Sequence, residues 1–260
     1  MIKRATISKK LQKQFGKCVR EYDLINEGDR VLVGLSGGKD SLALLHLIKN
    51  FQRIVPFEFE YKAVTVDYGD GLNLDHLQQH CEEYGIPFEI YRTEIAQTAE
   101  SHIRENSSFC SFFSRMRRGS LYSACQQMGF NKLALGHHLD DAAESFFMNM
   151  FYNGTLRTLA PKYTSKYDIE VIRPLIKCRE AQNTAFAEEN GFATISDDAC
   201  PAMKFPVKMP YAREKTKQWL KTMESEHEDL FKMLKTSFGH LHAETFFDQR
   251  YMTVRHDKEE

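Results

Sequence analysis

The stretch RVLVGLSGGKDSLALLHLIKN, residues 30–50, decides the fold. Its opening residues are mostly apolar and β-branched, which predicts a short buried strand over residues 30–35. Residues 41–50 predict a helix. A glycine-rich turn, SGGKDS, joins the two at residues 36–41. Ligands of open α/β sheets lie beyond the carboxyl ends of the strands, where helices begin, so this order predicts a phosphate-binding loop.

The residue types of the turn suit phosphate. Two glycines let backbone N–H groups approach phosphate oxygens, a lysine adds positive charge, and two serines add hydroxyls. An aspartate follows the lysine, so the string differs from a Walker A motif, which has Ser or Thr there. The alternative is a strand-to-helix turn without a ligand, which the complete string in this context disfavours. We expect the whole loop to bind ATP, and Lys39 to act in catalysis as well: Ser36, Gly37, Gly38, Lys39, Asp40 and Ser41.

Strand and helix signals alternate along much of the chain. Further strands are expected near residues 57–67, 88–94, 132–137 and 168–172, and further helices near residues 6–25, 73–84, 113–129 and 140–152. This alternation predicts an α/β fold, a doubly wound parallel sheet with helical N-terminal and C-terminal additions. We divide the chain into a basic helix over residues 1–26, an ATP-using domain over 27–178 and a mainly helical region over 179–260.

The composition excludes several classes of protein. With 42% hydrophobic and 27% charged residues, the chain is typical of an ordinary globular protein. No apolar run approaches the roughly 20 residues of a membrane helix, and no signal peptide is recognised, so we expect a cytoplasmic protein without a membrane partner. Six cysteines are too sparse for a disulfide scaffold and fit buried hydrophobes, catalytic thiols or metal ligands.

Basic residues gather at the N-terminus although the formal net charge is only −1. Residues 1–20 contain no acid and seven basic side chains: Lys3, Arg4, Lys9, Lys10, Lys13, Lys17 and Arg20. Such an arm suits a phosphate backbone. A solvated helix face explains the same pattern.

A second polar cluster follows the expected strand 132–137. Gly136 and His137 stand at its end, and Asp140 and Asp141 open the next helix. Carboxylates are ligands that Mg²⁺ prefers, and histidine can contact an α-phosphate, so we predict ATP contacts at the first pair and Mg²⁺ at the second. The helix dipole also favours acids in a first turn, so we expect one of the two acids to serve that purpose. A zinc site is excluded, because cysteines and the usual ligand spacing are lacking.

The loop string matches the pyrophosphate loop of the PP-loop ATP pyrophosphatases. That resemblance implies cleavage of ATP to AMP and pyrophosphate, with the loop at the departing β- and γ-phosphates. It also implies that Asp67, at the end of the second strand, lies near the adenosine. A turn aspartate is the alternative there.

Further strings, in order, closely resemble the tRNA 2-thiocytidine biosynthesis proteins over nearly the whole chain. They are EGD at 27–29, RMRRG at 115–119, LGHHLDD at 135–141, NMFY at 149–152, PK at 161–162, IRPL at 172–175 and CRE at 178–180. The resemblance implies that the C2 oxygen of a tRNA cytosine attacks the α-phosphate of ATP, and that a sulfur nucleophile then displaces AMP. Mg²⁺, Lys39 and the loop amides would stabilise the charge on phosphate. The implied partners are tRNA, a cysteine desulfurase or other persulfide donor, and a second copy in a homodimer.

Three arginines next to the expected thiol chemistry, Arg115, Arg117 and Arg118, suit RNA phosphates. Helix-surface arginines are the alternative.

The cysteines depart from the family pattern. Family members carry Cys-x-x-Cys before the RMRRG string and a third cysteine about ninety residues later, which together hold a [4Fe–4S] cluster. This chain has Cys110 at the first position, Phe113 at the second, and Cys200 as the nearest match to the third. Phenylalanine cannot ligate iron, which puts the cluster in doubt.

Three interpretations of the thiols stay open. In the first, another residue, such as Cys125, Cys178 or a nearby Asp, supplies the missing ligand of a cluster. Alternatively Cys110 and Cys200 carry and resolve a persulfide without iron, similar to the tRNA 2-thiouridine synthetases. In the third, the sulfur chemistry is lost and another substrate is adenylated. We take Cys110 and Cys200 as the catalytic thiols, and Cys18, Cys81 and Cys125 as structural.

Two other functions compete with tRNA thiolation. A tRNA lysidine synthetase shares the loop, but the strings at residues 115–119 and 178–180 argue against that branch. A degenerate nucleotide- or tRNA-binding module has no need of an intact loop together with Asp140 and Asp141.

Overall fold

The computed structural model describes residues 2–96, 109–195 and 211–251, with side chains from residue 114 in the second range and from residue 212 in the third. Two compact units are distinguished, Met1–Lys217 and Gln218–Glu260. The predicted three-part division of the chain stays a prediction.

A six-stranded sheet forms the centre of the first unit, in the order β3-β2-β1-β4-β6-β5. Its strands are β1 (Arg30–Gly34), β2 (Glu60–Asp67), β3 (Phe88–Arg92), β4 (Lys132–Ala134), β5 (Lys162–Thr164) and β6 (Glu170–Ile172). Neighbouring strands run parallel except for the antiparallel pair of β5 and β6. The predicted doubly wound parallel sheet is therefore confirmed. The edge strand β5, with only three residues, was not predicted.

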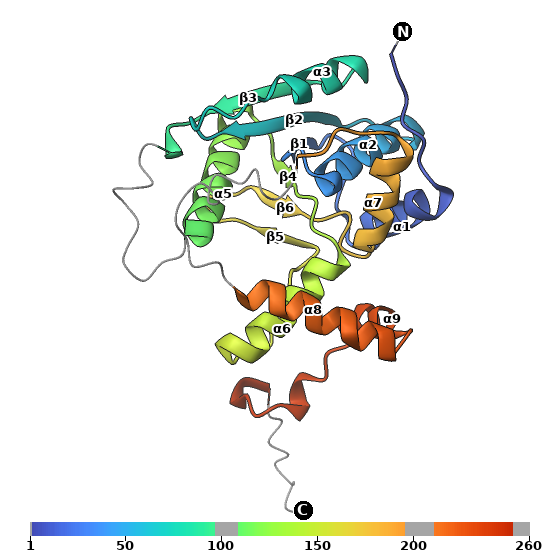
Figure 1. The fold of residues 1–260 in the computed structure, drawn as a ribbon, viewed down its shortest axis with the longest axis vertical. Helices are drawn as coiled ribbons and strands as arrows, with labels where there is room; N and C mark the ends of the chain where they lie inside the picture. The colour runs from blue at the N-terminus through green and yellow to red at the C-terminus, as the bar shows by residue number, and fades with distance from the viewer. Residues whose placement is uncertain (1, 97–108, 196–210, 252–260) are drawn as a thin grey trace, which may run out of the picture. The chain divides into compact units, whose positions relative to one another are not determined.

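Helices cover both faces of the sheet (Figure 1). The helices before residue 190 that the structure describes are α1 (Lys9–Glu21), α2 (Lys39–Ile54), α3 (Asp75–Glu83), α5 (Phe109–Met128), α6 (Leu139–Asn153) and α7 (Glu180–Glu189). Figure 1 shows α5 on one face and α1, α2 and α7 on the other. The first helix is shorter than the predicted 6–25, because Ser8 caps its start by accepting from the backbone N–H of Leu11.

Helices α2 and α5 form the core together with the two faces of the sheet. Residues 41–48 of α2 are all buried, since α2 packs against the sheet and is covered by α1 and α7. On the other face, α5 contributes to an apolar cluster with the strands. That cluster includes Leu32, Val64, Leu121, Ala124, Cys125 and Leu133.

The chain order places a switch point between β1 and β4. From β1 the chain passes through α2 to β2 on one side, and it returns through α5 to β4 on the other. At such a point the loops after neighbouring strands diverge and leave a crevice at the carboxyl edge of the sheet. The predicted phosphate loop follows β1 and therefore opens into this crevice.

The C-terminal part is helical where the structure describes it. Helix α8 (Tyr211–Glu226) crosses the boundary between the units, and α9 (Leu230–Ser237) lies in the second. Two 3₁₀ turns follow at Ala243–Thr245 and Gln249–Tyr251. Among the described residues, no helix combines the length and the apolarity needed to cross a bilayer.

Candidate active site

The phosphate loop is shaped by its own serines. The Oγ of Ser41 accepts from the backbone N–H of Ser36 at 3.1 Å and donates to the carbonyl of Gly38 at 2.8 Å. Gly38 is the N-cap of α2, so the loop runs directly into the positive end of a helix dipole. Backbone and dipole together suit an anion, and the binding of ATP by these residues stays a prediction.

Gly37 and Gly136 must be glycines, because atoms of neighbouring segments lie where the Cβ of any other residue would be. Gly37 has a φ of +81°, and a Cβ there would collide with the side chain of Ile195. Ile195 also donates its backbone N–H to the Gly37 carbonyl at 2.9 Å. At Gly136, after β4, a Cβ would lie 3.0 Å from the backbone carbonyl of Asp40. The end of β4 therefore touches the first turn of α2, which brings both predicted clusters into one site.

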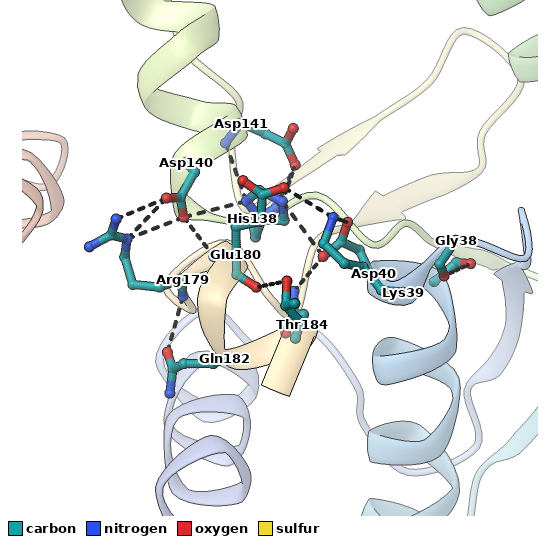
Figure 2. A network of polar contacts seen from close by, with 12 residues as sticks. Gly38, Lys39, Asp40, His138, Asp140, Asp141, Arg179, Glu180, Gln182 and Thr184 are labelled. Atoms are coloured by element: carbon teal, nitrogen blue, oxygen red, sulfur yellow. Dashed lines mark hydrogen bonds and ion pairs between the residues drawn. The ribbon is translucent and has the colours of Figure 1, made fainter. Parts of the chain in front are cut away.

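The first turn of α7 holds the two charged residues of the loop. Lys39 Nζ donates to Glu180 Oε1 at 3.0 Å, and Asn183 Nδ2 donates to Asp40 Oδ1 at 2.9 Å. Asn183 is fully buried. Figure 2 shows how the starts of α2, α6 and α7 meet at these contacts. Three helix N-termini thus face one site, which favours a ligand as negatively charged as a triphosphate.

Charges around Lys39 keep it cationic. Burial alone would lower the pKa of Lys39, but Asp40 and Glu180 outweigh burial and raise it above the ordinary value. Burial would likewise raise the pKa of Glu180, yet hydrogen bonds from Lys39 and Lys217 lower it. Each charge of the loop is therefore stabilised by an opposite one.

Asp140 joins α6 to α7. Its Oδ2 accepts the backbone N–H of Glu180 at 2.8 Å, and its Oδ1 accepts from Arg179 Nε at 3.1 Å. Burial alone would raise the pKa of Asp140, but hydrogen bonds from His138 and Arg179 bring it down to about 2. This carboxylate is ionised at any physiological pH and fixes the start of α7 opposite the loop.

Asp141 and His138 close the start of α6 as a capping box. The backbone N–H of His138 donates to Asp141 Oδ2 at 3.0 Å, and the backbone N–H of Asp141 donates to His138 Nδ1 at 3.3 Å. Burial lowers the pKa of His138, but contacts with Asp140, Asp141 and Asp40 raise it above the ordinary value. Protonation turns Nδ1 from an acceptor of the cap hydrogen bond into a donor toward Asp140 Oδ2, 3.6 Å away.

His137 has the opposite environment. Its Nδ1 lies 3.3 Å from Nε of Arg173, which can only donate, so the ring proton must be on Nε2. Burial, followed by the charge of Arg173, lowers the pKa of His137 to about 4. Arg173 follows β6, is only 5% exposed, donates to the Ala160 carbonyl at 2.6 Å and stacks on Tyr163. His137 is thus a neutral hydrogen-bond donor at the carboxyl edge.

Two cations of α8 complete the cluster. Arg213 donates to Asp141 Oδ1 at 2.6 Å and to Glu144 Oε2 at 2.8 Å. Lys217, one helical turn later, lies 3.0 Å from Glu180 Oε2. Neither contact was predicted, and only the spacing of two cations at i and i+4 in the sequence hints at a shared face.

The remaining predicted residues are placed as follows. Asp67 ends β2, and its Oδ1 accepts the backbone N–H of Gly69 at 2.9 Å, so it also shapes the turn. Arg115 and Arg118 are exposed on α5, and Arg117 is close enough to His137 to lower its pKa. Their roles toward adenosine and RNA stay predictions.

Neither proposed thiol can be placed by its side chain. Cys110 lies in the first turn of α5, but its side chain and that of Phe113 are outside the described side chains, and Cys200 is outside the described residues. In the described part of the chain, no three His, Cys, Asp or Glu side chains are grouped to hold a metal ion. Cys18, Cys81 and Cys125 are buried, and burial raises the pKa of each thiol to about 12, as expected for residues that serve packing. Cys178 is buried as well.

Comparison with known proteins agrees with this geometry. Residues 6–207 match the PP-loop domain family. The chain is 44% identical to a tRNA-cytidine(32) 2-sulfurtransferase of Syntrophotalea carbinolica over 72% of this chain and 73% of that protein. It is 35% identical to a protein of the same name in Geobacter metallireducens, over 95% of each chain.

A solved structure shares the fold. The U34-tRNA thiolase NcsA from Methanococcus maripaludis with its [4Fe-4S] cluster superposes with a TM-score of 0.72 and 22% identity, over 95% of this chain and 84% of that one. Family match, relatives and fold agree with the clamped phosphate loop. The chain therefore belongs to the PP-loop family and, within it, to the tRNA-cytidine(32) 2-sulfurtransferases.

Proposed function

We propose that this protein is an ATP-dependent tRNA sulfurtransferase that replaces the C2 oxygen of cytidine 32 with sulfur. The observation that carries the proposal is the loop of residues 36–41, which α7 clamps at the carboxyl edge of the sheet beside His137. The substrate and its position are supported by the name that relatives at 35% and 44% identity share. Because tRNA is the substrate, the reaction belongs in the cytoplasm.

The loop supports adenylation as the first step. The cytosine C2 oxygen attacks the α-phosphorus of ATP, the bond to the bridging β-oxygen breaks, and pyrophosphate leaves. Lys39 and the N-terminus of α2 face the negative charge that accumulates on the leaving group. The Nε2–H of His137 suits a non-bridging oxygen of the transferring phosphoryl group, because Arg173 holds the ring neutral with its proton on that atom.

Sulfur then replaces AMP at C2. We propose that Cys110 carries a persulfide supplied by a cysteine desulfurase or a similar donor. Its terminal sulfur bonds to C2, and AMP departs with the original C2 oxygen. The thiolate of Cys200 attacks the Cys110 sulfur, so that C2 keeps its sulfur and a Cys110–Cys200 disulfide forms. An external dithiol then reduces that disulfide.

The residue types favour the cluster-free route. Phe113 cannot ligate iron, and the buried Cys125, with a pKa of about 12, lies in the apolar core cluster.

Magnesium suits the acid-rich edge of the site. Mg²⁺ usually takes one or two carboxylates and several phosphate oxygens, so Asp140 and Asp141 with the triphosphate suffice. Both carboxylates pair with arginines in the structure, Asp140 with Arg179 and Asp141 with Arg213. Bound there, Mg²⁺ would neutralise charge on the phosphates.

A nucleoside survey tests the function. Tandem mass spectrometry of tRNA from a cell that lacks the gene should show no 2-thiocytidine, and the wild-type gene but not K39M should restore it. Unchanged 2-thiocytidine in the deleted cell would contradict the proposal. Anaerobic purification with iron and sulfide analysis decides the thiol step, since stoichiometric iron would rule out the cluster-free route. The homodimer that the family resemblance implies is tested on the same sample by sedimentation.

A further inference from the structure

Glu180 is shared by two lysines from different helices. Its Oε1 accepts from Lys39 Nζ at 3.0 Å, and its Oε2 lies 3.0 Å from Lys217 Nζ. All three side chains are partly buried, with exposed fractions between 25% and 34%. Figure 2 shows Lys39 on α2 and Glu180 on α7 side by side at the mouth of the loop.

The carboxylate therefore has one more cationic partner than it needs. Glu180 raises the pKa of Lys217, after the opposing effect of burial, just as it does for Lys39. Either lysine alone can neutralise the carboxylate. The other is then available for a different anion.

A triphosphate bound in the loop competes with Glu180 for the ammonium group of Lys39. The phosphates bring several negative charges to the end of α2, and Lys39 is the cation of the loop itself. If Lys39 turns to phosphate without a second lysine at Glu180, a half-buried carboxylate is left facing those charges. Such an uncompensated charge is costly in a partly buried site.

We propose that Lys217 is a positioning residue that keeps Glu180 neutralised and so releases Lys39 to the phosphates of ATP. Glu180 holds Lys39 ready at the loop, and Lys217 takes over the carboxylate when ATP binds. This inference deepens the proposed function, on which it rests for the identity of the nucleotide. It gives the second turn of α8, which the sequence does not connect with the loop, a part in ATP binding.

The mechanism predicts a dependence between two mutations. In K217M, Lys39 alone must neutralise Glu180, so we expect about a tenfold weaker affinity for a non-hydrolysable ATP analogue. In E180Q no charge needs neutralising. K217M added to E180Q should then change the affinity by less than about twofold. The affinities are measured by isothermal titration calorimetry on the full chain.

Lys215 provides the matched control. It lies two residues earlier on the same helix, is exposed and forms none of the described contacts. K215M removes the same charge, so it should leave the affinity within about twofold of wild type. K217R should restore most of the affinity because it keeps a cation at Glu180. If K217M does not fold, K217Q takes its place in the cycle.

Steady-state kinetics distinguish a positioning role of Lys217 from general damage to the structure, because the two affect KM and kcat differently. K217M should raise the KM for ATP in pyrophosphate release about tenfold and change kcat by less than about twofold. Equal weakening by K217M in the wild-type and E180Q backgrounds, or an effect no larger than that of K215M, would overturn the inference. The ATP affinities do not depend on tRNA, so a protein that shows the cycle but makes no 2-thiocytidine would refute the proposed function alone.

Discussion

His137 and His138 are consecutive residues, yet they lie in opposite electrostatic surroundings. His137 points to Arg173 and lies near Arg117, and its pKa falls to about 4 because of burial and these cations. His138 lies among Asp40, Asp140 and Asp141, which raise its pKa against the effect of burial. The carboxyl edge of the sheet thus has a cationic side at the end of β6 and an acidic side at the starts of α6 and α7.

The two sides differ in how their charges are paired. On the acidic side each carboxylate has a cationic partner, such as Arg179 at Asp140 or Arg213 at Asp141. On the cationic side, Arg173 is buried and forms no ion pair with any described carboxylate. The acidic side is held by its own ion pairs. The cationic side is held, among the described residues, by the hydrogen bonds of Arg173 and its contact with the Tyr163 ring.

The largest expected effect comes from removing a charge on the acidic side. Asp140→Ala deletes the charge-assisted hydrogen bonds to Arg179 and to the backbone of Glu180. We expect the free energy of unfolding to fall by about 3 kcal/mol. Urea denaturation measures it. A loss below about 1 kcal/mol would show that the ion pairs do not hold the two helices together.

The cationic side should respond differently to the same kind of change. Arg173→Met removes a buried charge that has no counter-ion among the described residues, but it also removes two hydrogen bonds, so the two effects oppose each other. We expect the free energy of unfolding to change by about 1 kcal/mol or less. A loss as large as that of Asp140→Ala in the same urea experiment would remove the contrast between the sides.

Lowering the pH should reveal how much His137, on the cationic side, contributes to the stability of the fold. The pKa of His137 is lowered from 6.5 to about 4, so the unfolded chain binds a proton more readily. This histidine stabilises the fold above about pH 6.5, and that contribution is lost as pH falls toward 4, by roughly 3 kcal/mol at most. His137→Asn should flatten the decline relative to wild type. Parallel stability–pH curves for the two proteins would contradict this.

His138 should act with the opposite sign. Its pKa is raised, so its contribution is complete below about pH 6.5 and is lost as pH rises through the higher pKa of the folded state. His138→Asn keeps a capping side chain at the start of α6 and should lose this dependence. Thermal melts across that pH range measure it, and an unchanged slope would count against a charged His138.

The smallest effect is expected at the exposed edge of the acidic side. Arg213 is 61% exposed although it contacts Asp141 and Glu144. Arg213→Met should cost less than about 1 kcal/mol in urea denaturation. Water screens the largely exposed guanidinium, and the buried Glu144, whose pKa burial raises, can bind a proton once its partner is removed. A larger loss would show that α8 has a structural role on this side.

The sequence predicted the parts of the site that follow from local patterns. The loop, its strand and helix, and the cluster after β4 are each continuous in the chain, so strand-turn-helix signals were enough to place them at one edge of a parallel sheet. The short strand β5 was missed because three residues carry almost no periodicity.

The partners of the loop could not be predicted in the same way. Glu180 and Asn183 reach Lys39 and Asp40 across 141 and 143 residues of sequence. Such contacts depend on where α7 packs against α2, and no local pattern encodes that packing. The opposite surroundings of His137 and His138 were also invisible, since both histidines share one string and differ only in which way each faces.

Isotope transfer from the base tests the central claim most directly. A tRNA carrying ¹⁸O at C2 of cytidine 32 is incubated with the wild-type protein, ATP, Mg²⁺ and a persulfide donor. Adenylation of that oxygen predicts that the released AMP carries the ¹⁸O in step with 2-thiocytidine formation, and that K39M releases neither product. Unlabelled AMP released alongside 2-thiocytidine would contradict activation of the base by the phosphate loop.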